Sequence, residues 1–261
     1  MIIGGIAGMV SRTLTAPFEL AKIQQQNSFM PNSTLKEVIK KEGITGLWKG
    51  NYSNCIRIFP QMAINYSIYQ YVKPIVLSYF KNEALSNLIS GGISGMIAMT
   101  VIYPMENARS RLSLQTNNNH YTGLLDVLKR TKSRELYNGL RMSLIGFTPY
   151  NALNFMFYNQ YKNYFNSIGY DNMYINLFSG GLSGISAVTF TYPTDLIRRR
   201  LQLQGFDELV PRYTGIIDCI KKIYTSQGIK GFYGGLLMCY VKIFPAIALQ
   251  FWTIELLKNN I

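Results

Sequence analysis

The sequence has few of the residues that enzyme and metal chemistry need. It holds one histidine, His120, and three scattered cysteines, Cys55, Cys219 and Cys239, without a Cys-x-x-Cys pair. A disulfide-built scaffold and a Cys/His metal site are therefore not expected. No Ser/His/Asp set and no Walker-type phosphate loop is present either. We expect no enzyme, no cofactor and no metal.

Charge is scarce as well, and one sign of it dominates. Charged residues make up 15% of the chain, against about 25% in an average soluble domain, and 26 Lys and Arg face 13 Asp and Glu. The net charge of +13 fits nucleic acid, an anionic lipid surface or an anionic small ligand. No run of about 20 residues is wholly apolar, which is the usual criterion for a membrane span. Composition alone therefore leaves the class of protein open, although a hydrophobic share of 48% excludes a disordered chain.

The sequence does contain three copies of one unit. Each copy has a Gly-Gly-x-x-Gly segment and, thirteen residues after its first glycine, a proline: Pro17, Pro104 and Pro193. These prolines are 87 and 89 residues apart, close to one third of the 261-residue chain. A fixed period is the mark of a repeat architecture. We therefore divide a single domain, 1–261, into the copies 1–80, 81–168 and 169–261.

Each copy predicts two long helical segments. They are 2–26 with 52–73, 86–115 with 139–162, and 174–204 with 234–258. Interior prolines break soluble helices but are tolerated in membranes, and the Gly-x-x-x-Gly pairs permit close helix contact in lipid. A soluble helical-repeat array, with a period of about 33–47 residues, fits poorly. The pattern predicts an all-α membrane protein with six transmembrane helices in three pseudo-symmetric two-helix repeats, with short amphipathic helices between.

A longer motif now becomes visible in all three copies. Pro-x-[Asp/Glu]-x-x-[Lys/Arg] is followed by an aromatic-x-Gly element, namely Trp48-Lys49-Gly50, Tyr137-Asn138-Gly139 and Tyr233-Gly234-Gly235. Over essentially the whole chain this resembles the mitochondrial carrier family, in its adenine nucleotide and coenzyme A branch. The resemblance implies a six-helix bundle, matrix-side short helices and alternating access to one central site in the mitochondrial inner membrane, or in that of a related organelle. One departure is that Glu42-Gly43 and its counterpart Gln227-Gly228 have no equivalent in the second copy.

The repeated acid and base predict ion pairs, because isolated charges in a bilayer pair or face water. A local pair within each copy is one possibility. The family resemblance implies instead that each acid pairs with the base of the next copy, in a ring that closes the matrix side. The implied pairs are Glu19–Arg109, Glu106–Arg198 and Asp195–Lys22, with Gln26 and Gln202 as braces; Ser113 does not match the brace position.

The opposite, cytoplasmic gate of the family lacks two of its three acids in this chain. Its acid positions read Gln70, Asn159 and Glu255, its bases are Lys73, Lys162 and Lys258, and Tyr69 and Tyr158 precede two of the acid positions. At most one ion pair, Glu255 with Lys73, is then expected. The two tyrosines are candidate braces through their hydroxyls. A matrix-open state should be less favoured than in a carrier with three pairs.

Threefold symmetry is broken near the middle of the helices. Positions five before the odd-helix prolines read Arg12, Met99 and Val188, and positions three before the even-helix prolines read Arg57, Gly146 and Lys242. Three bases without a matched acid, at the depth where transporter sites lie, predict an anion-binding site. The alternative is that each base snorkels or serves folding.

The remaining site residues indicate the kind of anion. Gly146 leaves room for a planar ring beside Phe147, Tyr150 and Asn154 offer hydrogen bonds, and Arg199 is a candidate phosphate ligand or a solvated cation. The resemblance to carriers of adenine-containing substrates implies adenine nucleotide exchange, with coenzyme A or thiamine diphosphate as alternatives. A basic nucleic-acid binder needs exposed aromatics on a basic face, whereas these aromatics follow apolar helices. We expect a nucleotide-like substrate, membrane lipid with cardiolipin as a candidate, no nucleic acid, and a monomer.

Overall fold

The computed structural model describes residues 2–27, 35–115, 121–169, 173–206 and 210–259, and this part of the chain is helical with no strand. In the first copy α1 (Ile2–Leu14) leads into α2 (Ala16–Gln26), and α4 (Asn51–Ile56) into α5 (Ile58–Phe80). The second copy has α6 (Glu83–Leu114) and α9 (Leu140–Ser167), and the third has α10 (Met173–Leu203) and α12 (Leu236–Asn259). Six long helical segments are therefore present, as the repeat predicts.

Short helices connect the two long segments of each copy. They are α3 (Leu35–Glu42) and η1 (Ile44–Trp48) in the first copy, α7 (Leu124–Arg130) and α8 (Ser133–Leu136) in the second, and α11 (Ile216–Gln227) and η2 (Ile229–Tyr233) in the third. The long helices run past several of the predicted ends: α5 reaches Phe80 and α9 reaches Ser167. The α5 extension, residues 74–80, is mostly apolar, the α9 extension, residues 163–167, mixes Asn and Ser with two aromatics, and neither contains a glycine to end the helix.

Proline acts differently in the different copies. The first odd segment is interrupted at Thr15, just before Pro17, and the first even segment at Arg57, before Pro60. In α6 and α10 the corresponding prolines, Pro104 and Pro193, lie inside one continuous helix. Thr15 Oγ1 donates a hydrogen bond of 2.8 Å to the Ser11 carbonyl. A side-chain donor therefore occupies a carbonyl at the interruption.

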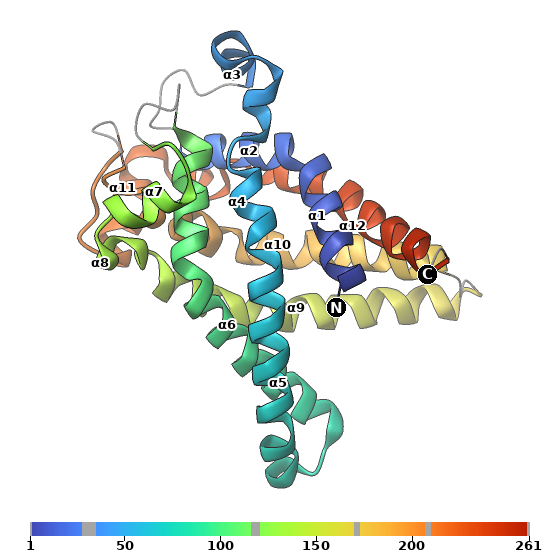
Figure 1. Cartoon of the computed structure of the whole chain (residues 1–261). Coiled ribbons are helices and arrows are strands. Elements are labelled where there is room, and N and C mark those ends of the chain that lie inside the picture. The colour runs from blue at the N-terminus through green and yellow to red at the C-terminus, as the bar shows by residue number, and fades with distance from the viewer. Residues whose placement is uncertain (1, 28–34, 116–120, 170–172, 207–209, 260–261) are drawn as a thin grey trace.

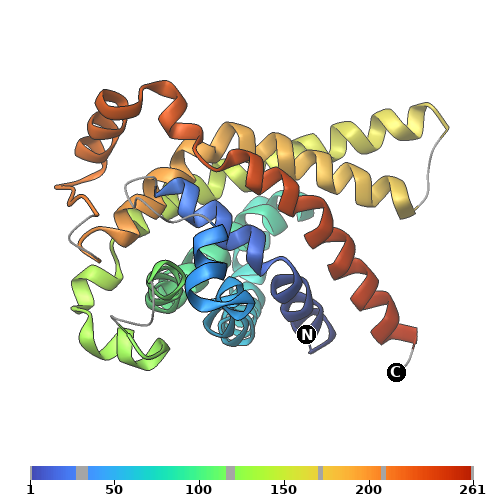
Figure 2. The ribbon, with the colours of Figure 1, turned by 90° about the horizontal axis from the view of Figure 1, so that it is seen from above.

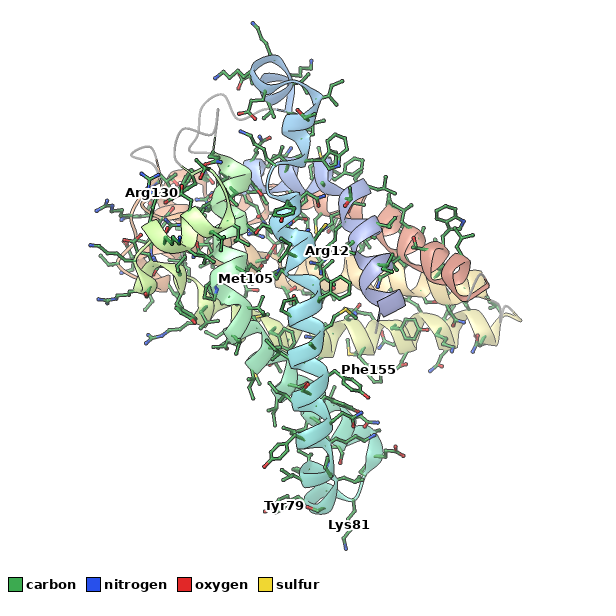
Figure 3. The ribbon with its side chains drawn as sticks, viewed as in Figure 1. Arg12, Tyr79, Lys81, Met105, Arg130 and Phe155 are labelled. Carbon is green, nitrogen blue, oxygen red and sulfur yellow. The ribbon has the colours of Figure 1, made fainter. Side chains whose placement is uncertain are left out.

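The long helices pack in three neighbouring pairs: α5 along α6, α9 along α10, and α1 along α12. The pairs approach one another at one end of the molecule and diverge at the other (Figures 1 and 2). The tip of the α5–α6 pair, with Tyr79 and Lys81, lies far from the centre (Figure 3). The short helices α7, α8 and α11 gather on the converging side (Figure 1). The molecule is therefore closed at one end and splayed at the other.

Glycines on the odd helices admit phenylalanines from the even helices of the same copy. A Cβ added at Gly5 would lie 2.6 Å from Phe59 Cε1, and one at Gly95 would lie 2.5 Å from Phe147 Cζ. Real Cβ atoms do not come this close to a neighbour. Both glycines are therefore required by close packing of α1 on α5 and of α6 on α9, in agreement with small residues at helix contacts in membranes.

The outer surface of the bundle suits lipid. Large apolar side chains such as Val101, Phe155 and Phe190 are more than half exposed, and Figure 3 shows Phe155 along α9. By hydropathy and length alone, α6 and a segment over 229–250 qualify as membrane spans within the described residues.

Two buried arginines tie the short helices to the long ones. Arg111 Nη2 lies 3.5 Å from Glu135 Oε2 of α8, and Arg200 Nη2 donates to Gln227 Oε1 of α11 at 2.8 Å. Each arginine is about 2% exposed. The second copy has no equivalent of Gln227-Gly228, and Glu135 of α8 takes the place of Gln227 as the partner of the arginine.

Candidate functional site

The repeated acids and bases meet where the three helix pairs converge. Lys22 Nζ lies 2.7 Å from Asp195 Oδ2, Arg109 Nη2 lies 3.2 Å from Glu19 Oε1, and Arg198 Nη2 pairs with Glu106 Oε1. These are the three pairs that the family resemblance implies. Among the described residues no ion pair joins the acid and base of the same copy. We call Glu19, Lys22, Glu106, Arg109, Asp195 and Arg198 the ion-pair ring.

The two predicted brace glutamines differ in what they hold. Gln26 Nε2 donates to Asp195 Oδ2 at 3.2 Å, so it touches an ion pair of the ring. Gln202 Nε2 donates to Tyr103 Oη at 3.0 Å, and its Oε1 accepts from Arg199 Nη1 at 3.0 Å. Gln202 therefore supports the layer next to the ring without contacting a ring carboxylate itself.

Two residues without a role in the sequence interpretation, Tyr103 and Tyr192, fix the ring helices to the even helices. Both are fully buried, and their hydroxyls donate to the carbonyls of Asn138 at 3.0 Å and Gly234 at 2.7 Å. Each also stacks on the aromatic residue of the aromatic-x-Gly element, with ring centroids 6.3 Å apart. The available signal was a tyrosine directly before the proline in copies two and three, where copy one has Ala16.

The expectation of three bases without a matched acid is wrong for two of them. Arg57 Nη1 lies 2.6 Å from Glu106 Oε2, and Lys242 Nζ lies 2.5 Å from Glu19 Oε2. A carboxylate has two oxygens, so each of these ring acids accepts one base on each oxygen. Sequence spacing along one helix does not reveal how far a long side chain reaches toward another helix.

The third base, Arg12, has a neutral partner. Its Nη1 donates to Asn54 Oδ1 at 2.9 Å, and Figure 3 shows it near the centre of the molecule, beside α1. Arg12 and Lys242 line a cavity of about 330 Å³ between α1, α5 and α12, together with Gln61, Asn65 and Gln250. The cavity combines cationic groups with amides, which suits an anion that also accepts and donates hydrogen bonds.

A second cavity lies where the threefold pattern lacks a cation. It measures about 250 Å³, and Lys22, Gly146, Phe147, Tyr150 and Asp195 are among its lining residues. Gly146 takes the place that Arg57 and Lys242 occupy in the other copies, so no second base reaches Asp195 from α9. The Asp195 side chain is accordingly 28% exposed, against 13% for both Glu19 and Glu106.

Two of the predicted substrate residues lie elsewhere. Arg199 is buried, and its Nη1 donates to Ser110 Oγ and Gln202 Oε1, so the structure places it in the layer next to the ring. This is not the solvated face of the alternative interpretation. Asn154, on α9, is not among the lining residues of either cavity. Its Oδ1 is buried and has no hydrogen-bond partner within the described part of the chain.

The residues of the predicted cytoplasmic gate lie on the diverging ends of the helices. Tyr69 Oη donates to Asn87 Oδ1 at 2.9 Å and Tyr158 Oη donates to Asn176 Oδ1 at 3.4 Å, so each tyrosine holds its own helix pair together. Gln70 donates to Tyr66 Oη at 2.7 Å.

The predicted ion pair of this gate is only partly described. Lys73 Nζ lies 3.8 Å from Glu83 Oε1, while the side chains of Glu255 and Lys258 lie outside the described part of the chain. Asn159 and Lys162 lie on α9, which diverges from α5 toward this end (Figure 1). In this conformation α5 and α9 do not come together at the predicted gate.

Comparison with known proteins agrees with this architecture. The family model for mitochondrial carrier proteins matches residues 1–80, 80–169 and 170–261. The mitochondrial adenine nucleotide transporter ADNT1 of Arabidopsis thaliana is 33% identical, over 98% of this chain and 85% of its own length. Solute carrier family 25 member 16 of Homo sapiens is 32% identical, over 98% and 86%. The mitochondrial carrier protein CoAc1 of Arabidopsis thaliana is 31% identical, over 99% and 88%. With three matched repeats and six long helices around a ring of ion pairs, this chain belongs to the mitochondrial carrier family, and it is a membrane transporter and not an enzyme.

Proposed function

We propose that this carrier exchanges adenine nucleotides, ADP for ATP or ATP for phosphate, by alternating access across the mitochondrial inner membrane. The observation that carries the proposal is the pair of unlike cavities beside one ion-pair ring. One cavity holds Arg12 and Lys242, and the other holds Gly146, Phe147 and Tyr150. A nucleotide has the same two unlike parts, an anionic phosphate chain and an aromatic base.

The first cavity suits the phosphate chain. Arg12 donates to the neutral amide of Asn54, and among the described residues it forms no ion pair with a carboxylate. Lys242 is paired with Glu19 but remains 29% exposed, so a phosphate can approach it. Charge-assisted hydrogen bonds from such groups are stronger than neutral ones. Arg57, buried against Glu106, contributes positive charge and does not line this cavity.

The second cavity suits the base. Gly146 lines it without a side chain, and Thr194, whose Oγ1 would lie 2.7 Å from a Cβ at Gly146, packs against that position and lines the same cavity. Phe147 offers a ring for stacking, and the Tyr150 hydroxyl offers a hydrogen bond. Lys22 and Asp195 line the same cavity, so a bound base lies directly beside one pair of the ring.

The ring supplies the matrix-side closure in this proposal. Its three ion pairs join α2, α6 and α10, and they must separate before a substrate passes toward the matrix. Tyr69, Tyr158 and the residues of the opposite gate would close the other end in the alternate state. The substrate lowers the free-energy barrier between the two conformations only if it binds the intermediate conformation more tightly than either end state.

Coenzyme A is a second candidate substrate. Thiamine diphosphate, which also carries phosphate groups, is a third. Coenzyme A contains an adenine nucleotide, so the same two cavities serve it, and two of the relatives above are a carrier named CoAc1 and an adenine nucleotide transporter. The proposal also includes a monomer, a multi-pass location in the inner membrane, and bound lipid such as cardiolipin.

The test is uptake into liposomes that contain the purified carrier and are preloaded with ATP, ADP, coenzyme A, thiamine diphosphate or phosphate. We expect labelled ADP or ATP to exchange fastest with an internal adenine nucleotide. Arg12→Ala should lower the uptake at least about tenfold, since it removes a charge-assisted contact. Arg141→Ala, an exposed arginine at the start of α9, is the matched control. Exchange of coenzyme A without nucleotide exchange would replace this proposal by its second candidate.

A further inference from the structure

One buried amide lies between the two arginines of the first copy. Asn54, on α4, is 5% exposed. Its Oδ1 accepts a hydrogen bond of 2.9 Å from Arg12 Nη1, and Arg57 Nη2 lies 3.5 Å from the same oxygen. Arg57 is also bound to Glu106 at 2.6 Å. A single neutral oxygen therefore links the cavity arginine to an arginine that is committed to the ring.

The amide occurs only in the copy where two arginines face each other. Four residues after the last glycine of each aromatic-x-Gly element, the three copies have Asn54, Ser143 and Cys239. Ser143 Oγ lies within hydrogen-bond distance of Tyr103 Oη and the Gly139 carbonyl, so it serves local packing. At the position of Arg12, copies two and three have Met99 and Val188.

Its neutrality matters for the charge of the cavity. A carboxylate at this position would pair with both guanidinium groups and cancel much of their attraction for an anion. A shorter side chain would leave Arg12 free to turn toward Glu106, which already accepts from Arg57 and Arg198. An amide oxygen orients the guanidinium and removes none of its charge.

We propose that Asn54 is a positioning residue that aims Arg12 into the cavity between α1, α5 and α12 and keeps its charge available for a phosphate-bearing substrate. This inference rests on the proposed function. It adds a residue that acts through Arg12 and makes no substrate contact of its own. It also predicts that substrate preference depends on the charge at position 54, because Arg12 attracts a diphosphate more strongly than a monophosphate.

The test uses Asn54→Asp and Asn54→Ala in reconstituted liposomes, with KM and maximal rate measured for ADP and for AMP. Asn54→Asp keeps the shape and adds the charge, so the KM for ADP should rise about tenfold or more and the preference for ADP over AMP should shrink. Asn54→Ala should also raise the KM for ADP, because Arg12 is then free to turn toward Glu106, but by less than Asn54→Asp, because no carboxylate is added beside Arg12. Asn51→Asp is the matched control, since Asn51, one turn earlier on α4, donates to Thr13 Oγ1.

A double variant separates positioning from a merely structural role. In an Arg12→Ala background, Asn54→Asp should cause little further rise in KM, whereas a structural defect would lower transport in both backgrounds. An unchanged KM and an unchanged ADP preference in Asn54→Asp, in a folded protein, would overturn the inference. If the wild type exchanges coenzyme A or thiamine diphosphate instead of ADP, the proposed function fails, and the same variants test Asn54 with that anion. If it exchanges none of the anions, both fail.

Discussion

Lys242 Nζ lies 2.5 Å from Glu19 Oε2, although the two residues are 223 positions apart in the sequence. The contact brings a base from the middle of the last even helix onto a carboxylate of the ion-pair ring. Arg109 holds the other oxygen of the same carboxylate. In the proposed mechanism, substrate attraction and gate closure would therefore draw on the same charged group, and a substrate that binds Lys242 would withdraw one of the two cations on Glu19.

Lys242→Gln should destabilise the closed ring as well as weaken substrate binding. The substitution removes a hydrogen bond to a charged group, worth about 1.5–3 kcal/mol, while Arg109 still neutralises Glu19. We expect a lower thermal unfolding midpoint in detergent. Lys230→Gln, at an exposed position on η2, should leave the midpoint unchanged. Equal midpoints for the two variants would show that the Lys242–Glu19 contact adds no stability.

Lys22→Asp should be more damaging than Lys242→Gln. Asp195 has no second base from the even helix of the neighbouring copy, because Gly146 stands there, so Lys22 is its one ion-pair partner within the described residues. Breaking a buried pair leaves an uncompensated charge and costs about 3–5 kcal/mol. The double variant Lys22→Asp with Asp195→Lys should recover part of both the stability and the transport, as measured in detergent and in liposomes. A double variant no better than the single one would argue against a direct pair.

The sequence predicts the ring well because the motif recurs at a fixed spacing in three copies. Its threefold repetition places Glu19, Glu106 and Asp195 at one depth, and the family resemblance then supplies which base each acid meets. The helix boundaries follow from the same period. Their ends differ from prediction where a helix continues past the predicted end, as in the mostly apolar residues 74–80 of α5.

The sequence does not predict contacts that depend on the angles between helices. Arg57 and Lys242 were expected without acids because no acid lies near them along their own helices, yet the convergence of the helix pairs brings ring carboxylates within 2.6 Å. Asn54 was missed for the same reason, since its significance depends on Arg12 from another helix. Such contacts are fixed by packing in three dimensions and not by any pattern along one segment.

Gly95→Ala should displace Phe147 and alter the second cavity. The added Cβ would lie 2.5 Å from Phe147 Cζ, so the ring must move or α6 must separate from α9. Overpacking of this kind costs typically about 1–3 kcal/mol. We expect a lower unfolding midpoint and a higher KM for the nucleotide. Gly92→Ala is the matched control on the same helix, because nothing lies within 4 Å of its added Cβ. Normal KM in Gly95→Ala would remove Phe147 from the site.

Cys219 should resist alkylation in the folded carrier. Burial on α11 leaves it 0% exposed and raises the pKa of its thiol to about 12. The thiolate is the reactive form, so at pH 8 only about one molecule in ten thousand carries it. Raising the pH to 9 increases that fraction tenfold, yet burial still blocks access. Mass spectrometry after maleimide treatment should find Cys219 unlabelled until the protein is unfolded. Labelling in the folded state at pH 8 would mean that α11 detaches from α10.

Because two of the three acids of the cytoplasmic gate are missing, we expect the matrix-open state of this carrier to be disfavoured. Gln70 and Asn159 stand where the family pattern has acids, and in this conformation Gln70 hydrogen-bonds to Tyr66 of its own helix. Gln70→Glu with Asn159→Asp should add up to two ion pairs when that end closes, and so stabilise the matrix-open state. We expect altered exchange rates in liposomes, with Lys81→Glu at the exposed tip of α5 as a charge control. Unchanged kinetics in the double variant would mean that these positions do not meet in the transport cycle.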